Sequence, residues 1–370
     1  MITLLIIMSS LYLVFMLVMI TAWIRIPSTN SSIKKQPALS VSVIIPVRNE
    51  SKNIAKLLRQ LMSQSYPKEL FEIIVVNDHS TDNTSAIIEQ LKIEEGINLR
   101  LMNLKKLKEG KKAALTEGIT AANGEIILTT DGDCEVSKEW IQTIINSFDE
   151  HTQMAFGLVA ILDKNFFSKL QMIDFAALIG IGAASWRLGT AGMCNGANLA
   201  FRKLVFQECG GYEGSEKHPS GDDEFLLRKV SEQYPQGIQF IKSRLAVVFT
   251  GAQPNLQTFI QQRIRWAGKW KLHKDITTKL VAIFVFLFYS SLLIGTGISF
   301  FSSQYLSIIL AIWGVKWLLD VVLVKAVLNI GNQRLPLIES IVLSMLYPFY
   351  AIGIGISTIN YTFEWKGRKY

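Results

Sequence analysis

Hydrophobic residues follow two kinds of pattern along this chain. Uncharged runs cover Met1 to Ile24, Leu280 to Val315 and Ser340 to Phe363, while the stretch between the first two runs carries most of the charge. A helix needs about 20 apolar residues to cross a bilayer. The run after Leu280 is too long for one such helix, and polar residues at 302–304 divide it into two. The pattern therefore predicts an N-terminal transmembrane anchor, a charged central domain and roughly three C-terminal transmembrane helices.

The second half of the divided run continues to about Leu328 and contains charged residues, among them Lys316 and Asp320. A charge at the centre of a bilayer costs about 2.5 to 3.5 kcal/mol on insertion scales. The two residues are spaced four apart and so share one helical face, and we expect them to pair or to face protein. An interfacial helix is the alternative to a spanning one.

The first uncharged run could be a cleaved signal peptide, but it lacks a basic start and a small-residue cleavage pattern. An uncleaved anchor is the better interpretation. Arg25, Lys34 and Lys35 follow it closely, so the positive-inside tendency predicts that residues 27–279 lie in the cytoplasm, on the inner face of a bacterial inner membrane. Four spans would place the basic tail, residues 364–370, outside. Either one segment lies in the interface or the tail departs from the tendency.

Composition narrows the class of protein. With 49% apolar residues and a mean hydropathy of +0.29, the 370-residue chain is too hydrophobic for an ordinary soluble domain. The net charge of +8 fits attraction to anionic membrane lipids and to a phosphate-bearing substrate. Nucleic acid is not expected as a partner, because the basic residues form no compact stripe with interleaved aromatics. The three cysteines show neither metal-ligand spacing nor an even count, which fits a reducing compartment.

The central region alternates between short apolar runs and amphipathic segments. Predicted strands cover Val41–Val47, Phe71–Val76, Asn98–Leu104 and Glu125–Thr130, and predicted helices cover Asn53–Gln64, Thr84–Lys92 and Lys111–Ala122. Repeated βα units predict an α/β fold with a mostly parallel sheet flanked by helices. Such sheets bind ligands at the carboxyl ends of their strands.

Polar residues follow three of the predicted strands, at 46–50, at 77–82 and at Asp131-Gly132-Asp133. We expect these strand ends to converge on one crevice. Two carboxylates one residue apart can share Mg²⁺ or Mn²⁺, which keeps coordination positions open for phosphate oxygens. That ion would neutralise the charge growing on a departing diphosphate. His79 has no partner at metal-ligand spacing and is expected to be incidental.

With these residues in place, the chain resembles family 2 glycosyltransferases, the GT-A-fold enzymes that include cellulose, chitin and hyaluronan synthases and ceramide and carotenoid glycosyltransferases. The resemblance covers roughly residues 41–270 and rests on blocks that occur in the family's order. These blocks are Val41–Glu50, Val76–Asp82, Lys111–Leu115, Asp131–Asp133, Gly221–Asp223 and Gln262–Trp266.

The resemblance implies a donor site for a nucleotide sugar, usually a UDP-sugar. The residues that would hold the nucleotide are Pro46, Arg48, Glu50, Asp78, Asp131 and a lysine, for which spacing slightly favours Lys112 over Lys111. Asp131 and Asp133 match the family's metal-binding pair, with Asp133 as the direct ligand of Mg²⁺ or Mn²⁺.

The resemblance also implies where the acceptor reacts. Asp223 matches the family's general base, which takes the proton of the attacking hydroxyl, and Asp222 precedes it where the family more often has Glu. Acidic residues here also suit a helix N-terminus. Gln262, Arg265 and Trp266 match an interfacial helix whose arginine faces diphosphate and whose tryptophan lies beneath the acceptor sugar. We expect Trp270 to belong to an aromatic belt instead.

The sequence leaves the roles of two further segments undecided. Residues 192–198 and Arg202 resemble the family's segment beside the acceptor site, although a plain turn would also explain them. Phe175 to Trp186 is uncharged but too short to span a membrane, so it is either an interfacial helix or a core helix.

Taken together, the sequence predicts a membrane-bound inverting glycosyltransferase that moves a sugar from a nucleotide donor to a lipid or glycan acceptor. The predicted parts are an anchor (1–26), a cytoplasmic GT-A domain (38–250), interfacial helices (251–279), a C-terminal transmembrane region (280–363) and a basic tail (364–370). The alternatives are a processive polysaccharide synthase and a catalytically inactive nucleotide-binding scaffold. The small number of membrane helices and a tail similar to carotenoid-type enzymes favour a lipid-type acceptor.

Overall fold

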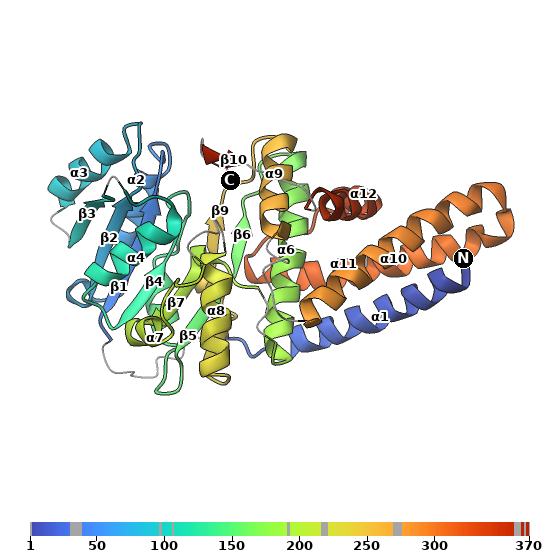
Figure 1. Ribbon diagram of the computed structural model, residues 1–370, viewed down its shortest axis with the longest axis horizontal. Coiled ribbons are helices and arrows are strands. Elements are labelled where there is room, and N and C mark those ends of the chain that lie inside the picture. Colours follow the sequence, from blue (N-terminus) through green and yellow to red (C-terminus); the bar gives the residue numbers. More distant parts are fainter. Residues whose placement is uncertain are drawn as a thin grey trace.

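A seven-stranded sheet forms the centre of the main body of the structure (Figure 1). The computed structural model describes residues 2–29, 39–95, 98–105, 107–190, 193–215, 221–268, 276–358, 364–365 and 368–369. Within these ranges the strands are β1 (Val41–Val47), β2 (Phe71–Asn77), β3 (Leu99–Asn103), β4 (Ile126–Thr129), β5 (Met154–Gly157), β7 (Leu199–Arg202) and β8 (Ile238–Ile241). Their order is β3-β2-β1-β4-β7-β5-β8. All pairs are parallel except those that β7 makes with β4 and β5, so the prediction of a mostly parallel α/β sheet is confirmed.

The first half of the sheet follows the sequence pattern closely. Nearly every residue of β1 and β2 is buried, as expected for parallel strands that are covered on both faces. The helices between the strands are α2 (Ile54–Met62), α3 (Thr84–Glu95) and α4 (Lys111–Ala121). Helix α4 packs against β1 and β2. Gly118 permits this approach, because a Cβ there would lie 2.6 Å from Cγ2 of Ile44.

The second half of the body places further segments around the same edge of the sheet. Its elements are α5 (Trp140–Ile145), α7 (Lys203–Glu208), α8 (Asp222–Gln233) and the parallel strand pair β6 (Val159–Ile161) and β9 (Val248–Thr250). An isolated bridge between Glu135 and Phe249 ties the segment after β4 to β9. This bridge brings the Asp131–Asp133 loop close to the end of β9.

Two helices, α6 (Phe166–Arg187) and α9 (Leu256–Ala267), lie between the sheet and the apolar helices (Figure 1). Helix α6 begins earlier than the uncharged run predicted, because Asn165 and Ser168 form a capping box. It is 22 residues long, and more than half of its most apolar 18-residue segment is buried. Since α6 packs against β6, α1, α11 and α12, it is a core helix, one of the two alternatives left open by the sequence.

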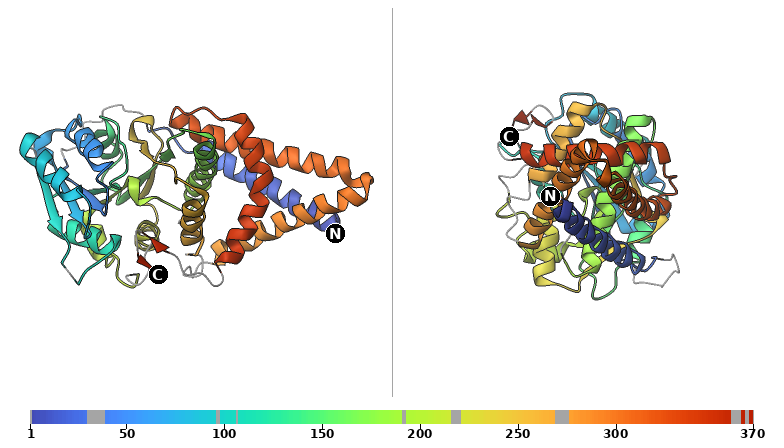
Figure 2. Two further views of the ribbon diagram at one scale, coloured as in Figure 1. Left: turned by 90° about the horizontal axis from the view of Figure 1, so that it is seen from above. Right: turned by 90° about the vertical axis from the view of Figure 1, so that its right-hand side faces the viewer.

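The remaining long apolar helices are α1 (Ile2–Ile24), α10 (Ile276–Phe301), α11 (Leu306–Ile330) and α12 (Leu337–Ser357). By length and composition these four and α6 are all able to cross a membrane. Helices α1, α10 and α11 extend together away from the body, whereas α12 runs crosswise to them (Figures 1 and 2). The short tail strands β10 (Glu364–Trp365) and β11 (Arg368–Lys369) lie on the same side of these helices as the sheet.

Lys316 and Asp320, two of the charged residues of α11, are paired, as the sequence predicted. The ammonium of Lys316 lies 2.8 Å from a carboxylate oxygen of Asp320. Lys316 also donates a hydrogen bond to Ser344 of α12 at 3.2 Å, and the hydroxyl of Tyr12 on α1 donates to Asp320 at 2.5 Å. These charged groups therefore stabilise contacts among α1, α11 and α12.

Candidate active site

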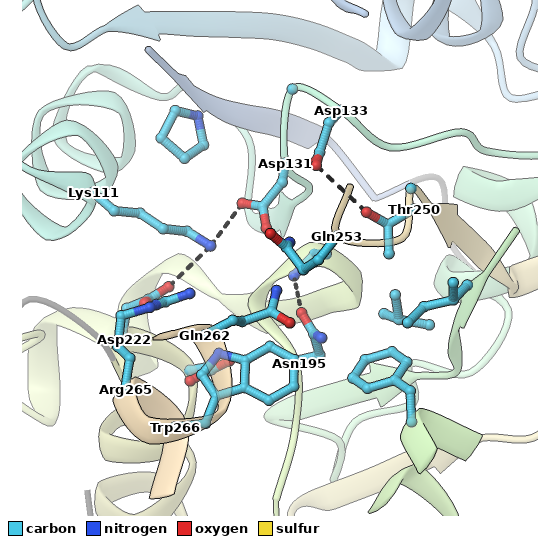
Figure 3. A pocket seen from close by; sticks show the side chains of 18 of the residues that line it. Lys111, Asp131, Asp133, Asn195, Asp222, Thr250, Gln253, Gln262, Arg265 and Trp266 are labelled. Atoms are coloured by element: carbon cyan, nitrogen blue, oxygen red, sulfur yellow. Dashed lines mark hydrogen bonds and ion pairs between the residues drawn. The ribbon is translucent and has the colours of Figure 1, made fainter. Parts of the chain in front are cut away.

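A cavity of about 450 Å³ lies where the ends of β1, β2 and β4 meet α6, α8 and α9 (Figure 3). It gathers residues that are far apart in the sequence. The predicted site residues that line it are Pro46, Arg48, Glu50, Asp78, Asp131, Asp133, Asp222, Asp223, Gln262, Arg265 and Trp266. The residues that follow β1, β2 and β4 converge because these strands are parallel and their carboxyl ends lie at the same edge of the sheet.

The ends of β1 and β2 form one side of the cavity. Arg48 donates hydrogen bonds from its guanidinium to the carbonyl oxygens of Asp78 and His79, at 2.9 and 3.3 Å. The carboxylate of Asp78 accepts a hydrogen bond from the backbone N–H of Gly110 at 3.0 Å, and Nδ1 of His79 lies 3.0 Å from its other oxygen. His79 therefore contacts a proposed nucleotide-binding residue, a role that the sequence pattern did not predict.

The loop after β4 carries Asp131 and Asp133. Gly132 lies between them because the backbone packs closely there: a Cβ would lie 2.9 Å from Cγ1 of Val47. Asp131 is in contact with Lys111, and Asp133 accepts a hydrogen bond from the hydroxyl of Thr250 at 3.5 Å.

These two carboxylates fit a divalent cation. The described residues contain no cluster of three or more acidic, histidine or cysteine side chains that could hold a metal ion. Mg²⁺ is usually bound by one or two carboxylates together with substrate phosphates and water. The pair at 131 and 133 is therefore a suitable donor set for a cation that binds together with a diphosphate.

The two lysines at the start of α4 have different surroundings. Lys111 lines the cavity, and its ammonium lies 2.6 Å from Asp131 and 3.5 Å from Asp222 (Figure 3). Burial disfavours the ammonium, but the neighbouring carboxylates outweigh this effect and raise the pKa of Lys111 above its ordinary value. Lys112 is buried and donates to the carbonyl oxygen of Ser215 at 2.6 Å. The slight preference for Lys112 is therefore corrected: Lys111 is the lysine that faces the cavity.

Asp223 lies at the N-terminus of α8. Its carboxylate accepts hydrogen bonds from the backbone N–H groups of Gly196, at 3.0 Å, and Glu224, at 2.8 Å. Gly196 has little free space, because a Cβ there would lie 3.0 Å from Oδ2 of Asp222. Asp222 is buried and Asp223 is partly exposed to the cavity. Asp223 is thus both held in place and open to a ligand.

Helix α9 brings Gln262, Arg265 and Trp266 to the opposite wall (Figure 3). Its first turn is capped by Asn255, whose side chain accepts from the N–H of Thr258 at 2.9 Å. Removal from bulk water lowers the pKa of Arg265, and the charges of Asp222 and Asp223 partly oppose this shift. The indole of Trp266 packs against Phe175 of α6, with 5.7 Å between ring centroids.

Other polar residues line the cavity although sequence reasoning gave them no role. Gln171 of α6 and Gln253 are joined by two hydrogen bonds of 2.8 and 3.0 Å, which hold the loop before α9 against α6. Thr250 also lines the cavity. A lone Gln or Thr carries no motif, so only the tertiary contacts reveal these residues.

The resemblance implied that residues 192–198 and Arg202 lie beside the acceptor. Only some of these residues line the cavity. Met193, Cys194 and Asn195 line the cavity, whereas Arg202 donates hydrogen bonds to the carbonyl oxygens of Asp149 and Thr152 away from it. Arg202 therefore does not line this cavity, although the resemblance implied a place beside the acceptor. Gly192 and Trp270, which also had predicted roles, lie outside the described residues.

Comparison with known proteins identifies the domain. Residues 42–210 match the family model described as Glycosyl transferase family 2. The chain therefore contains a glycosyltransferase domain of family 2, in agreement with the resemblance seen in the sequence.

Curated relatives belong to more than one kind of glycosyltransferase. The chain is 28% identical over 175 residues to a beta-monoglucosyldiacylglycerol synthase of Nostoc, covering 46% of this chain and 37% of the relative. It is 24% identical over 266 residues to the poly-beta-1,6-N-acetyl-D-glucosamine synthase of Staphylococcus epidermidis, covering 68% of this chain and 61% of the relative. Both matches thus leave a substantial part of the relative uncovered.

The fold is shared with a solved structure. The mannosyltransferase PcManGT from Pyrobaculum calidifontis, solved with GDP-Man and Mn²⁺, matches 96% of this chain and 95% of its own, with a TM-score of 0.55 and 15% identity. This likeness concerns the fold, and it extends over almost the whole chain, including the apolar helices.

Proposed function

We propose that this protein transfers a sugar from a nucleoside diphosphate sugar, most simply a UDP-sugar, to a hydroxyl group of a lipid or lipid-linked acceptor at a membrane. The observation that carries the proposal is the single cavity in which Asp78, Asp131, Asp133, Asp223 and Arg265 meet. These residues come from separate segments, and a protein without catalytic function would have no need to assemble all of them.

The donor would lie along the ends of β1, β2 and β4. In this arrangement Pro46, Arg48, Glu50 and Asp78 bind the nucleoside, and the diphosphate points towards Asp131, Asp133 and Lys111. A divalent cation, Mg²⁺ or Mn²⁺, bound at Asp131 and Asp133 would neutralise charge on the leaving diphosphate. Lys111 and Arg265 are cations on the protein itself that stabilise the same negative charge.

Asp223 is the proposed general base. As the acceptor hydroxyl attacks the anomeric carbon, its proton passes to the Asp223 carboxylate and the bond to the diphosphate breaks, leaving the electron pair on the nucleotide. A single displacement of this kind inverts the anomeric configuration. The two backbone N–H groups that bond Asp223 fix its direction, and Gln262 and Trp266 would border the acceptor.

The arrangement of the apolar helices supports a specific membrane topology. We infer that α1, α10 and α11 span the bilayer, while α12 lies across its cytoplasmic surface, with α9 and the core helix α6 beside it, because these three helices run crosswise to the others (Figures 1 and 2). Three spans from an outside N-terminus leave the basic tail in the cytoplasm. This topology removes the conflict with the positive-inside tendency that four spans would create.

A lipid acceptor fits this geometry better than a growing polymer. Helices α6 and α9 both line the cavity and lie next to the proposed membrane surface, so an acceptor held in the bilayer could reach Asp223. Three spans are also few for a protein that must enclose a polysaccharide channel. The match to a polysaccharide synthase keeps polymer formation as the second candidate.

The test is incubation of the purified full-length protein in lipid vesicles with a radiolabelled UDP-sugar and Mn²⁺. A discrete radiolabelled glycolipid is the expected product, and lipid mass spectrometry would identify both sugar and acceptor. A long water-soluble polymer would instead support the synthase. If nucleotide binds and no sugar is transferred to any lipid or glycan, the inactive-scaffold interpretation would be favoured.

A further inference from the structure

A second cavity, of about 400 Å³, lies where the C-terminal ends of α1 and α6 meet. Its walls include Leu17, Val18 and Ala22 of α1, and Arg25 and Arg187 lie at its edge. We call this cavity the α1/α6 groove. It is separate from the active site: Ile179 is the α6 residue of the active-site cavity that lies nearest in sequence to Arg187, and eight residues of helix span about 12 Å.

The apolar wall of the groove is open to its surroundings. Leu17 is 48% exposed and Val18 is 42% exposed. On a helix that spans a bilayer, such side chains contact acyl chains rather than water. The groove is thus shaped by the protein but needs a hydrocarbon occupant.

The polar end of the groove carries two cations. Arg25 follows the last turn of α1 and Arg187 is the last residue of α6, and both are exposed. Among the residues that the structure describes, neither guanidinium forms an ion pair with an acidic side chain. The only recorded bond between them is from Nε of Arg187 to the carbonyl oxygen of Arg25, at 3.5 Å. Both arginines line the same cavity, and guanidinium groups are suited to binding the oxygens of a phosphate group.

We propose that the α1/α6 groove binds an anionic phospholipid of the cytoplasmic leaflet, with its phosphate at Arg25 and Arg187 and an acyl chain along Leu17 and Val18. This proposal rests on the proposed membrane location. A zwitterionic lipid is a poorer fit because the cytoplasmic leaflet is rich in anionic lipids and the site carries two positive charges with no acidic partner among the described residues. Because α6 lines both cavities, such a lipid would also fix one end of a helix that borders the active site.

The experiment uses the full-length protein reconstituted with a mixture of phosphatidylglycerol and phosphatidylcholine, released into detergent and examined by native mass spectrometry. The Arg25→Gln, Arg187→Gln double variant should retain about 25-fold less phosphatidylglycerol, roughly 5-fold for each charge lost at the membrane surface. Arg334→Gln removes one exposed charge that lies outside the groove and that the proposed topology also places on the cytoplasmic side, and this variant should retain as much as the parent protein. Phosphatidylcholine retention should be equal in all of them.

A second variant, Val18→Trp, fills the hydrocarbon end and leaves both arginines in place. It should also reduce phosphatidylglycerol retention, whereas inorganic phosphate should not displace the lipid. Equal retention by the double variant and the parent would overturn the proposal, and displacement by inorganic phosphate would show a free-anion site instead. Because the readout needs no sugar transfer, a failure here leaves the catalytic proposal standing. Extraction of the protein from membranes by alkaline carbonate would separately refute the membrane location.

Discussion

The guanidinium of Arg263 lies 2.7 Å from the carboxylate of Asp174, and each side chain is at most 3% exposed. Arg263 belongs to the same helix as Gln262, Arg265 and Trp266, but it points away from the active-site cavity, towards α6. Its guanidinium carbon also lies 4.4 Å from the ring centroid of Trp266 and 4.6 Å from that of Phe259. The ion pair thus attaches the helix that carries the predicted motif to the core helix beneath it.

Asp174→Asn should therefore weaken the attachment of α9. Removing one partner of a buried ion pair leaves an uncompensated charge and costs about 3 to 5 kcal/mol. We expect a lower midpoint of thermal unfolding, together with a higher KM for the acceptor. The pair Lys108 and Glu117, which is far more exposed to solvent, provides a control, because Glu117→Gln should change stability by less than about 1 kcal/mol. Unchanged stability and KM in Asp174→Asn would show that the pair does not position α9.

The proposed base can be separated from the proposed metal site. Asp223→Asn keeps the size of the side chain but removes proton acceptance, so transfer should fall by about 10² to 10⁴-fold while nucleotide binding in the presence of Mn²⁺ is retained. Asp133→Asn should weaken both sugar transfer and nucleotide binding. Isothermal titration with UDP and Mn²⁺, alongside an initial-rate assay, measures the two effects. Wild-type turnover by Asp223→Asn would assign the base to another residue.

The two neighbouring lysines give a matched comparison. Lys111→Gln removes the cation that lies between Asp131 and Asp222, so binding of the donor diphosphate should weaken by about 10-fold or more. Lys112→Gln alters a buried contact with the carbonyl oxygen of Ser215, so it should lower thermal stability while changing donor binding less. If Lys112→Gln had the larger effect on donor binding, the assignment based on the cavity would be wrong.

A pH effect on stability is expected from the opposite edge of the sheet. Burial opposes ionisation of Glu72, but the N–H of Asn123, the hydroxyl of Ser42 and the guanidinium of Arg100 together lower the pKa of its carboxyl. Because the folded pKa lies below the unfolded value of about 4.3, this stabilisation is present above that pH and is lost as the pH falls through the folded pKa.

Glu72→Gln should accordingly reduce the free energy of unfolding at pH 7 by about 1 to 3 kcal/mol, and the difference from the parent protein should shrink below pH 4 or so. Denaturant unfolding in detergent at a series of pH values measures this difference in the free energy of unfolding. Glu69→Gln, at an exposed carboxylate on the preceding turn, is the control. A difference that stays constant down to pH 3 would contradict this account.

The proposed topology predicts which loops are accessible from each side of the membrane. Starting from a variant without reactive cysteines, a cysteine placed at Ser303, between α10 and α11, should react with an impermeant maleimide added outside intact cells. A cysteine placed at Arg334, between α11 and α12, should react only after the cells are opened. A protected Ser303 position or an exposed Arg334 position would contradict three spans.

The sequence by itself determined the local structure and the identity of most residues around the cavity. Its apolar runs predicted strands β1 to β4 within one or two residues, because the burial of parallel strands shows directly in their composition. Polar residues after these strands meet at one edge of any parallel sheet. Asp131 and Asp133 could therefore be proposed before any contact was known, whereas Asp223 was proposed from the family resemblance.

Tertiary structure decided the features that depend on helix orientation and on distant partners. Lys111 and Lys112 are about 100° apart around α4, and only the packing of α4 on the sheet determines which of them faces the cavity. Similarly, no local pattern pairs Arg263 with Asp174 or turns α12 crosswise to α10 and α11. Hydrophobicity specifies that a helix is buried in protein or lipid, but its direction is set by the side chains of the helices that it packs against.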